Sequence, residues 1–181
     1  MRKNRLWKII VCLIVFIPKP CSYAQMALEE SHQEVLEEMQ QQVPDVVTTS
    51  GQFERLVVVR MKQGADLLEG LTSAVEEEII NNAVILSGIG SLTSYHIHVV
   101  DNNIFPTENV FFKDSIPVDL TSVNGYVFNE KVHAHINISD ENMAIGGHLE
   151  PGSSVFTFAI ITIGVFDEEI NLERFDDKYW K

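Results

Sequence analysis

The chain has 181 residues, of which 26 are acidic and 13 are basic, so its formal net charge is −13 at pH 7. Such a charge repels nucleic-acid backbones and anionic lipids, which makes nucleic acid a poor candidate partner. Both cysteines, Cys12 and Cys21, lie within the first 24 residues. If that segment is removed, no disulfide or thiolate ligand is available, and histidine and carboxylate side chains must carry any chemistry.

The first 24 residues have the pattern of an export signal. A basic start is followed by an apolar run at residues 9–17, and small residues stand at Ser22 and Ala24, three and one before the expected cut. We therefore expect cleavage after Ala24 and a periplasmic or secreted product. The apolar run is shorter than the ~20 residues that span a bilayer, so no stable membrane anchor is expected. Cleavage would leave 8 basic against 26 acidic residues, a formal charge of −18.

A helix and a linker are expected ahead of the main domain. Residues 26–43 are helix formers with apolar residues at loosely helical spacing, and Pro44 ends the run. We therefore divide the remaining chain into an N-terminal helix and linker at residues 25–50, one domain at residues 51–176 and a tail at residues 177–181.

The domain opens with a strand and an amphipathic helix. Residues 52–64 contain a β-branched run and predict a strand that ends at Gly64. Asp66 is the expected N-cap of the helix that follows, and Asn81 and Asn82 lie near its expected end. Its apolar residues recur at steps of three and four and predict one buried face: Leu67, Leu68, Leu71, Val75, Ile79 and Ile80.

The rest of the domain is rich in strand patterns. Residues 83–100 predict two strands around a turn at Gly88-Ile89-Gly90-Ser91. Further strands are predicted at residues 108–115, 118–128, 131–139, 154–166 and 169–175. One long helix followed by many strands with short connections predicts an α+β fold, a curved antiparallel β-sheet with the helix packed on one face.

Three histidines in one predicted hairpin form a candidate metal site. His133 and His135 are two residues apart in a strand and therefore share a face. A turn centred on Asp140-Glu141 gives cross-strand pairs that sum to 281 and places His148 opposite His133. Three neutral imidazoles with an open fourth position suit Zn²⁺, although iron, manganese or nickel could use the same ligands. The alternative is a hairpin face without a metal.

Neighbouring residues add to this hairpin. Gly146 and Gly147 permit a bulge or a close approach of the backbone beside a ligand. Glu150, two residues after His148, is a candidate to orient a ligand or to act as a catalytic base on metal-bound water. His96 and His98 form a second pair on one face, which we interpret as a half-exposed strand surface or as a contribution to the metal region or to a subunit contact.

Two stretches resemble a known family. The segment "VHAHINISDENMAIGGHLEPGSSVFTFAIIT" is similar to the signature of the plants-and-prokaryotes-conserved (PPC) domain, in which His-x-His, a short hairpin and Gly-Gly-His-Leu precede a long strand. The earlier stretch from Gly64 to Val99 resembles the family's opening, a helix before a strand that ends in Gly-Ile-Gly-Ser. The resemblance covers about residues 51–176.

The resemblance implies an α+β fold that assembles as a homotrimer, with a metal at the histidine cluster in prokaryotic members. His133, His135 and His148 match the motif histidines, and Gly146 and Gly147 match its glycines. Plant members bind DNA through a separate AT-hook. This chain has no Arg-Gly-Arg-Pro sequence, is acidic and carries an export pattern, so it departs from them.

These observations favour an exported trimer with a three-histidine zinc site that binds a small molecule or a protein partner. One alternative is a metal-dependent hydrolase that uses metal-bound water. A second alternative, a DNA-binding regulator, rests on family analogy alone and is opposed by the acidity and the export pattern.

Overall fold

The computed structural model describes residues 46–172 and residue 175. The export signal, most of the segment at 25–50 and the tail at 177–181 therefore lie outside the described residues. The fold below is that of the unit from Val46 onward. Within the described residues, no helix combines the length and the apolar character needed to cross a membrane.

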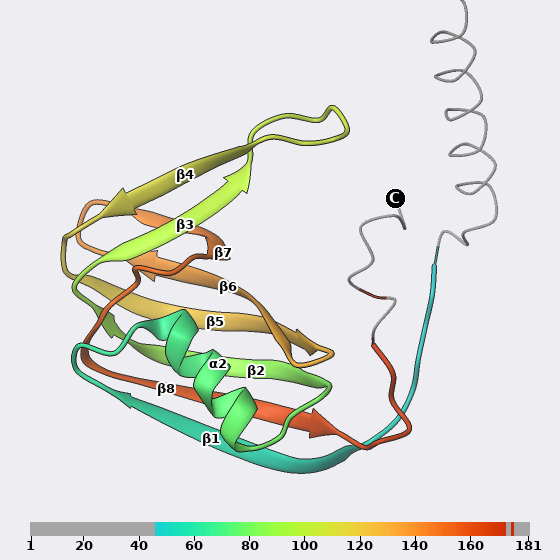
Figure 1. Cartoon of the computed structure of the whole chain (residues 1–181). Helices are drawn as coiled ribbons and strands as arrows, with labels where there is room; N and C mark the ends of the chain where they lie inside the picture. The colour runs from blue at the N-terminus through green and yellow to red at the C-terminus, as the bar shows by residue number, and fades with distance from the viewer. Residues whose placement is uncertain (1–45, 173–174, 176–181) are drawn as a thin grey trace, which may run out of the picture. The chain divides into compact units, whose positions relative to one another are not determined.

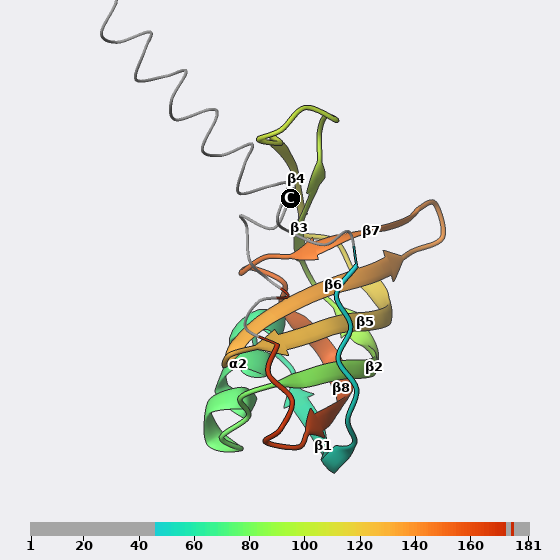
Figure 2. The same ribbon diagram turned by 90° about the vertical axis from the view of Figure 1, so that its right-hand side faces the viewer.

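Eight antiparallel strands form one sheet in the order β1-β8-β2-β5-β6-β7-β3-β4 (Figure 1). The elements are β1 (Phe53–Lys62), α2 (Leu67–Glu77), β2 (Ala83–Leu92), β3 (Tyr95–Val100), β4 (Asn109–Asp114), β5 (Val118–Phe128), β6 (Lys131–Ser139), β7 (Ala144–Leu149) and β8 (Val155–Phe166). An α+β fold with an antiparallel sheet and one helix in the described part is thus confirmed. The β3–β4 hairpin extends from the edge of the sheet opposite β1 (Figures 1 and 2).

The helix packs on one face of the sheet and contacts β1 and β6. Leu67, Leu71 and Val75 are buried on its inner side, and fully burying a leucine contributes about 1.5–3 kcal/mol. Ala134 and Ile136 of β6 are buried on the face that α2 covers. Because side chains alternate along a strand, their neighbours in β6 point to the opposite face. That opposite face carries His133 and His135.

The helix starts as predicted and ends earlier than predicted. The Asp66 carboxylate accepts hydrogen bonds from the amides of Leu68 and Glu69, at 3.0 and 3.1 Å, so Asp66 is the N-cap. The helix ends at Glu77, and Ile79 has a positive φ of 53° and is 87% exposed. The assignment of Ile79 to the buried face was therefore wrong, because a left-handed residue reverses the chain there and returns only Ile80 to the core.

Two strand predictions were also wrong. Gly88-Ile89-Gly90-Ser91 is not a turn but lies inside β2, where Gly90 lets the Phe158 carbonyl of β8 approach so closely that a Cβ would clash with it. β2 continues to Leu92, and Thr93 and Ser94 connect it to β3. No strand forms in the described part of residues 169–175, because Ile170 and Leu172 are buried as anchors of an irregular segment rather than as one face of a strand.

Candidate metal centre

The loop between β6 and β7 sets the alignment of the histidines. The Asp140 carboxylate accepts hydrogen bonds from the amides of Asn142 and Met143, at 2.6 and 2.8 Å, and the Asp140 amide donates to the Met143 carbonyl at 3.0 Å. This four-residue loop pairs Ser139 with Ala144. The loop therefore consists of residues 140–143, and its centre lies one residue further along the chain than the predicted centre. The reason is that the Asp140 side chain accepts hydrogen bonds from the two residues that follow Glu141.

The predicted cross-strand partner of His148 was therefore wrong. His148 pairs with His135 rather than with His133, a shift of two residues. A shift of one residue would have moved His148 to the other face, but a shift of two preserves the face. The three imidazoles consequently still lie on one side of the hairpin.

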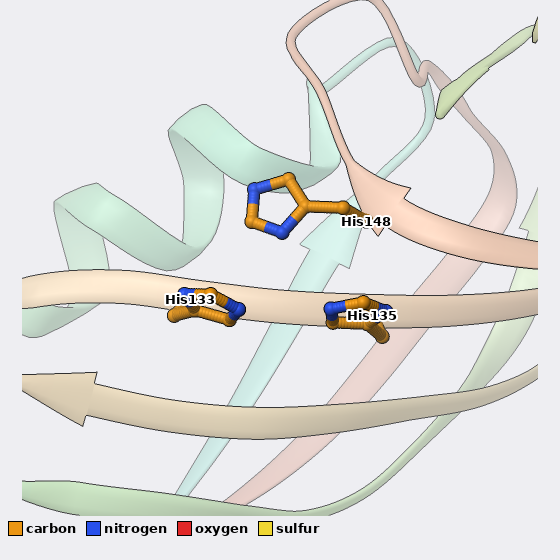
Figure 3. Close-up of side chains that lie close together, drawn as sticks. All are labelled: His133, His135 and His148. Atoms are coloured by element: carbon orange, nitrogen blue, oxygen red, sulfur yellow. The ribbon is translucent and has the colours of Figure 1, made fainter. Parts of the chain in front are cut away.

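His133 and His135 project from β6 toward the same region as His148 from the adjacent β7 (Figure 3). The ring centroid of His148 is 4.7 Å from that of His133 and 5.2 Å from that of His135. One nitrogen from each ring lies within 4.8 Å of the other two. Nitrogens on one tetrahedral zinc ion lie roughly 3.4 Å apart, so small side-chain rotations would bring the three onto one ion. This donor set fits a divalent metal.

A fourth imidazole joins this group from a strand that the sequence did not connect to the hairpin. His98 of β3 pairs with His148, and their ring centroids are 4.5 Å apart. His98 Nδ1 lies 2.7 Å from Glu150 Oε1, so Glu150 holds His98 and not one of the three motif histidines. His98, His148 and Glu150 form a second group whose ligand atoms all lie within 4.8 Å of one another.

Sequence reasoning gave two interpretations of His98, a half-exposed strand face or a contribution to the metal region or to a subunit contact, and the structure places it beside the metal region. β3 follows β2 in the chain but pairs with β7 and β4, so contact with His148 depends on a long-range strand order. The His-x-His spacing at residues 96–98 was the available signal. Its other member, His96, has its Nδ1 2.8 Å from the Pro151 carbonyl oxygen and belongs to neither group of three.

Burial and neighbouring imidazoles keep the central imidazole neutral. The pKa of His148 is lowered from 6.5 to about 4, mainly by burial and also by His133, His98 and His135, whereas Glu150 acts in the opposite direction. Burial, followed by His133 and His98, also lowers the pKa of His135. A neutral imidazole is the form that binds metal, so protons compete little with a metal for His148 near pH 7.

This pKa predicts a pH dependence of stability in the metal-free protein. Between pH 6.5 and about pH 4, His148 takes up a proton in the unfolded chain but not in the folded one. The free energy of unfolding should therefore fall as pH is lowered through that window and then cease to change from this group. Because His148 is only partly buried, solvent screening reduces the effect to about 1–2 kcal/mol.

Urea unfolding at pH 7, 5.5 and 4.5 in the presence of a chelator would measure the effect, with His148→Gln as the control. As the pH falls across this range, the free energy of unfolding of the wild type should decrease relative to that of His148→Gln. Parallel stability profiles for the wild type and the variant would contradict the assignment to His148.

A shallow hollow of about 430 Å³ opens beside the imidazoles. It is lined by His98, Val99, Val100, His135, Ile136, Asn137, Gly146 and Gly147. Gly146 lies two residues before His148 on the same strand face, and its missing side chain lets the Asn137 amide pack against it, because a Cβ there would clash with Asn137 Oδ1. Gly147 permits close strand packing, because a Cβ there would lie 2.6 Å from the His98 carbonyl oxygen. The two glycines thus permit close packing, of Asn137 against Gly146 and of β3 against β7 at Gly147.

A family model described as the Plants and Prokaryotes Conserved (PCC) domain matches residues 48–167. The "Bifunctional protein GlmU" of Synechococcus sp. (strain JA-3-3Ab) is 26% identical over 110 residues, which cover 60% of this chain and 17% of that protein. The chain therefore spans about a sixth of the length of this curated relative.

Solved structures share the fold. The crystal structure of a plant- and prokaryote-conserved (PPC) protein from Pyrococcus horikoshii is 26% identical, with a TM-score of 0.63, and the match covers 75% of this chain and 94% of that one. A metal-containing protein from Archaeoglobus fulgidus is 23% identical, with a TM-score of 0.59, and the match covers 66% of this chain and 86% of that one.

Proposed function

The chain belongs to the Plants and Prokaryotes Conserved (PCC) domain family, and we propose that it is an exported homotrimer that binds a zinc ion through His133, His135 and His148. The metal-bearing face would bind a small molecule or a protein partner. The observation that carries this proposal is the convergence of three imidazoles from two adjacent strands, with their ligand nitrogens within 4.8 Å of one another.

The donor set supports zinc. Three neutral imidazole nitrogens without a thiolate match a zinc site that leaves its fourth position open. The neighbouring fold from Archaeoglobus fulgidus is that of a metal-containing protein, which agrees with a metal in this fold. Bound zinc would polarise an oxygen or nitrogen atom of a ligand at the open position, and His133, His135 and His148 would hold the ion.

The surroundings of the site support ligand binding. The hollow above Gly146 lies beside His98 and His135 and is open to solvent. Asn137, another lining residue, donates from its side-chain amide to Ser122 Oγ at 2.8 Å and has an amide oxygen as an acceptor, and Val100 adds an apolar residue to the lining. A shallow site that combines a metal with few polar groups suits a small polar ligand or a protruding partner side chain.

The homotrimer is supported by an apolar surface on the histidine-bearing face. Leu56 and Val84 both pair with Gly164, Val84 pairs with Tyr126, and Tyr126 pairs with His133, so these residues lie in one row across the sheet. Leu56 is 60% exposed, and Val58, two residues further along β1, is 65% exposed. Exposed apolar residues grouped on one face are typical of a protein contact surface.

Metal content tests the site directly. Plasma mass spectrometry on protein purified without a tag should find zinc in the wild type and a strongly reduced amount in His133→Ala/His148→Ala. His96→Ala is the matched control, because it removes an imidazole that belongs to neither group of three. A folded wild type that takes up no divalent metal even when zinc is supplied would refute the metal site.

Sedimentation tests the assembly. We expect a trimer for the wild type and a smaller species for Leu56→Asp/Val58→Asp, because charge on the apolar surface opposes association. Ile79→Asp is the control, since Ile79 is also exposed, at 87%, and lies just after the end of the helix rather than on the histidine-bearing face. A wild type that sediments as a monomer at micromolar concentration would refute the trimer.

A further inference from the structure

The histidine cluster extends beyond the three motif residues as part of a row of paired residues across four strands, of which three carry the histidines. His135 pairs with His148, His148 pairs with His98, and His98 pairs with Phe111. Cross-strand partners point to the same face of a sheet. The row therefore places His148 between two separate sets of ligands, with His133 and His135 on the β6 side and His98 with Glu150 on the β3 side.

We propose that His98, His148 and Glu150 form a second divalent-metal position beside the three-histidine site. One ligand atom from each residue lies within 4.8 Å of the other two, which is the same closeness that the three-histidine group shows. The side chains of His98 and Glu150 are 19% and 24% exposed, so both are held in place yet remain accessible to an ion. This position goes beyond the proposed function but shares His148 with it.

The chemistry of the second position differs from that of the first. Two imidazoles and one carboxylate bring a negative charge and a hard oxygen donor, which suits Mn²⁺ and Fe²⁺ as well as Zn²⁺. Three neutral imidazoles bring no charge. In the metal-free protein the 2.7 Å hydrogen bond between His98 Nδ1 and Glu150 Oε1 holds these two side chains next to each other, and an ion bound by both atoms would displace the proton between them.

Sharing His148 links the two positions. A neutral imidazole has one nitrogen with a free lone pair, so His148 serves both ions at once only if it also loses its ring proton. The wild type alone therefore does not separate the two positions. Variants that remove the ligands on one side of His148 do.

The test is zinc and manganese binding by the full-length protein in the His133→Ala/His135→Ala background, measured by competition with a chromophoric chelator and by mass spectrometry. The second position predicts that this variant still binds about one ion per chain. Adding His98→Ala should abolish that binding, and adding Glu150→Gln should weaken it at least about 10-fold. Adding His96→Ala should leave it unchanged. The background His133→Asn/His135→Asn provides a second folded form if the alanine variant is unstable.

The outcomes distinguish the two sites. Loss of all metal from His133→Ala/His135→Ala, with metal retained in His98→Ala, would overturn the second position and leave the three-histidine site standing. Metal retained in His133→Ala/His135→Ala and lost from His98→Ala would establish the second position and overturn the three-histidine assignment. Metal binding that survives in His133→Ala/His135→Ala/His98→Ala would overturn the second position, because neither ligand set would then explain it.

Discussion

Replacement of His148 with alanine is expected to reduce metal affinity more than any other single histidine substitution in the protein. His148 contributes to both groups of ligands, whereas His133 and His135 belong to one group and His98 to the other. Each ligand of a structural zinc site contributes about 3 kcal/mol, so its loss should cost more than about 100-fold in affinity. His133→Ala and His98→Ala each leave one complete group of ligands, so each should retain measurable binding.

Chelator competition at pH 7 with Zn²⁺ would rank the affinities of the four single alanine variants of His98, His133, His135 and His148. The ring of His148 lies on the sheet face opposite α2 and is only partly buried, so His148→Ala should fold, which circular dichroism would verify. Equal losses for His133→Ala and His148→Ala would mean that one site uses both residues and that His98 binds nothing. No loss for His148→Ala would exclude both groups of ligands.

The predictions that succeeded rest on local periodicity. Alternation along β6 predicted that His133 and His135 share a face, because that conclusion needs no knowledge of the partner strand. The side chain of Asp66 capped α2 as its position before an apolar run predicted. The helical spacing of apolar residues also predicted that Ile79 is buried, and this was wrong. The spacing continues in the sequence, but the helix has already ended and Ile79 has a left-handed conformation.

The predictions that failed required the position of distant strands. A turn centred on Asp140-Glu141 predicted one register, but the hydrogen bonds of Asp140 move the hairpin centre by one residue. The glycines of β2 were interpreted as a turn because nothing local shows that Phe158 of β8 lies directly against Gly90. For the same reason the metal region was only one of the alternatives predicted for His98, since its neighbour His148 lies 50 residues further along the chain.

β3 and β7 form a shorter strand pairing than either of the two neighbouring pairs, β6 with β7 and β3 with β4. β3 and β7 share two paired positions, Ile97 with Leu149 and His98 with His148, whereas β6 and β7 share five. Gly147 is essential to the approach of the two strands, because a Cβ at this residue would lie 2.6 Å from the His98 carbonyl oxygen. A larger side chain must therefore displace backbone rather than the end of a flexible side chain.

Gly147→Val is accordingly expected to lower the free energy of unfolding by about 3 kcal/mol, at the upper end of the range for overpacked positions. The displacement should fall on β3 and β4, whose strand pairing with the rest of the sheet runs through β7, so amide hydrogen exchange should accelerate in Tyr95–Val100 more than in Lys131–Ser139. Metal binding by His98, His148 and Glu150 should weaken, because His98 moves away from His148. The three-histidine group should keep its metal, because it lies within the β6–β7 hairpin.

Urea unfolding and hydrogen exchange of Gly147→Val would be compared with those of Ala144→Val. Ala144 is an exposed residue of the same strand, so its substitution adds the same branched character to β7 without a clash. Stability and exchange equal to those of the control would show that β7 can move away from β3 at little cost. In that case the close packing at Gly147 would not be what holds His98 beside His148, and the Glu150 contact with His98 would remain as the interaction that positions it.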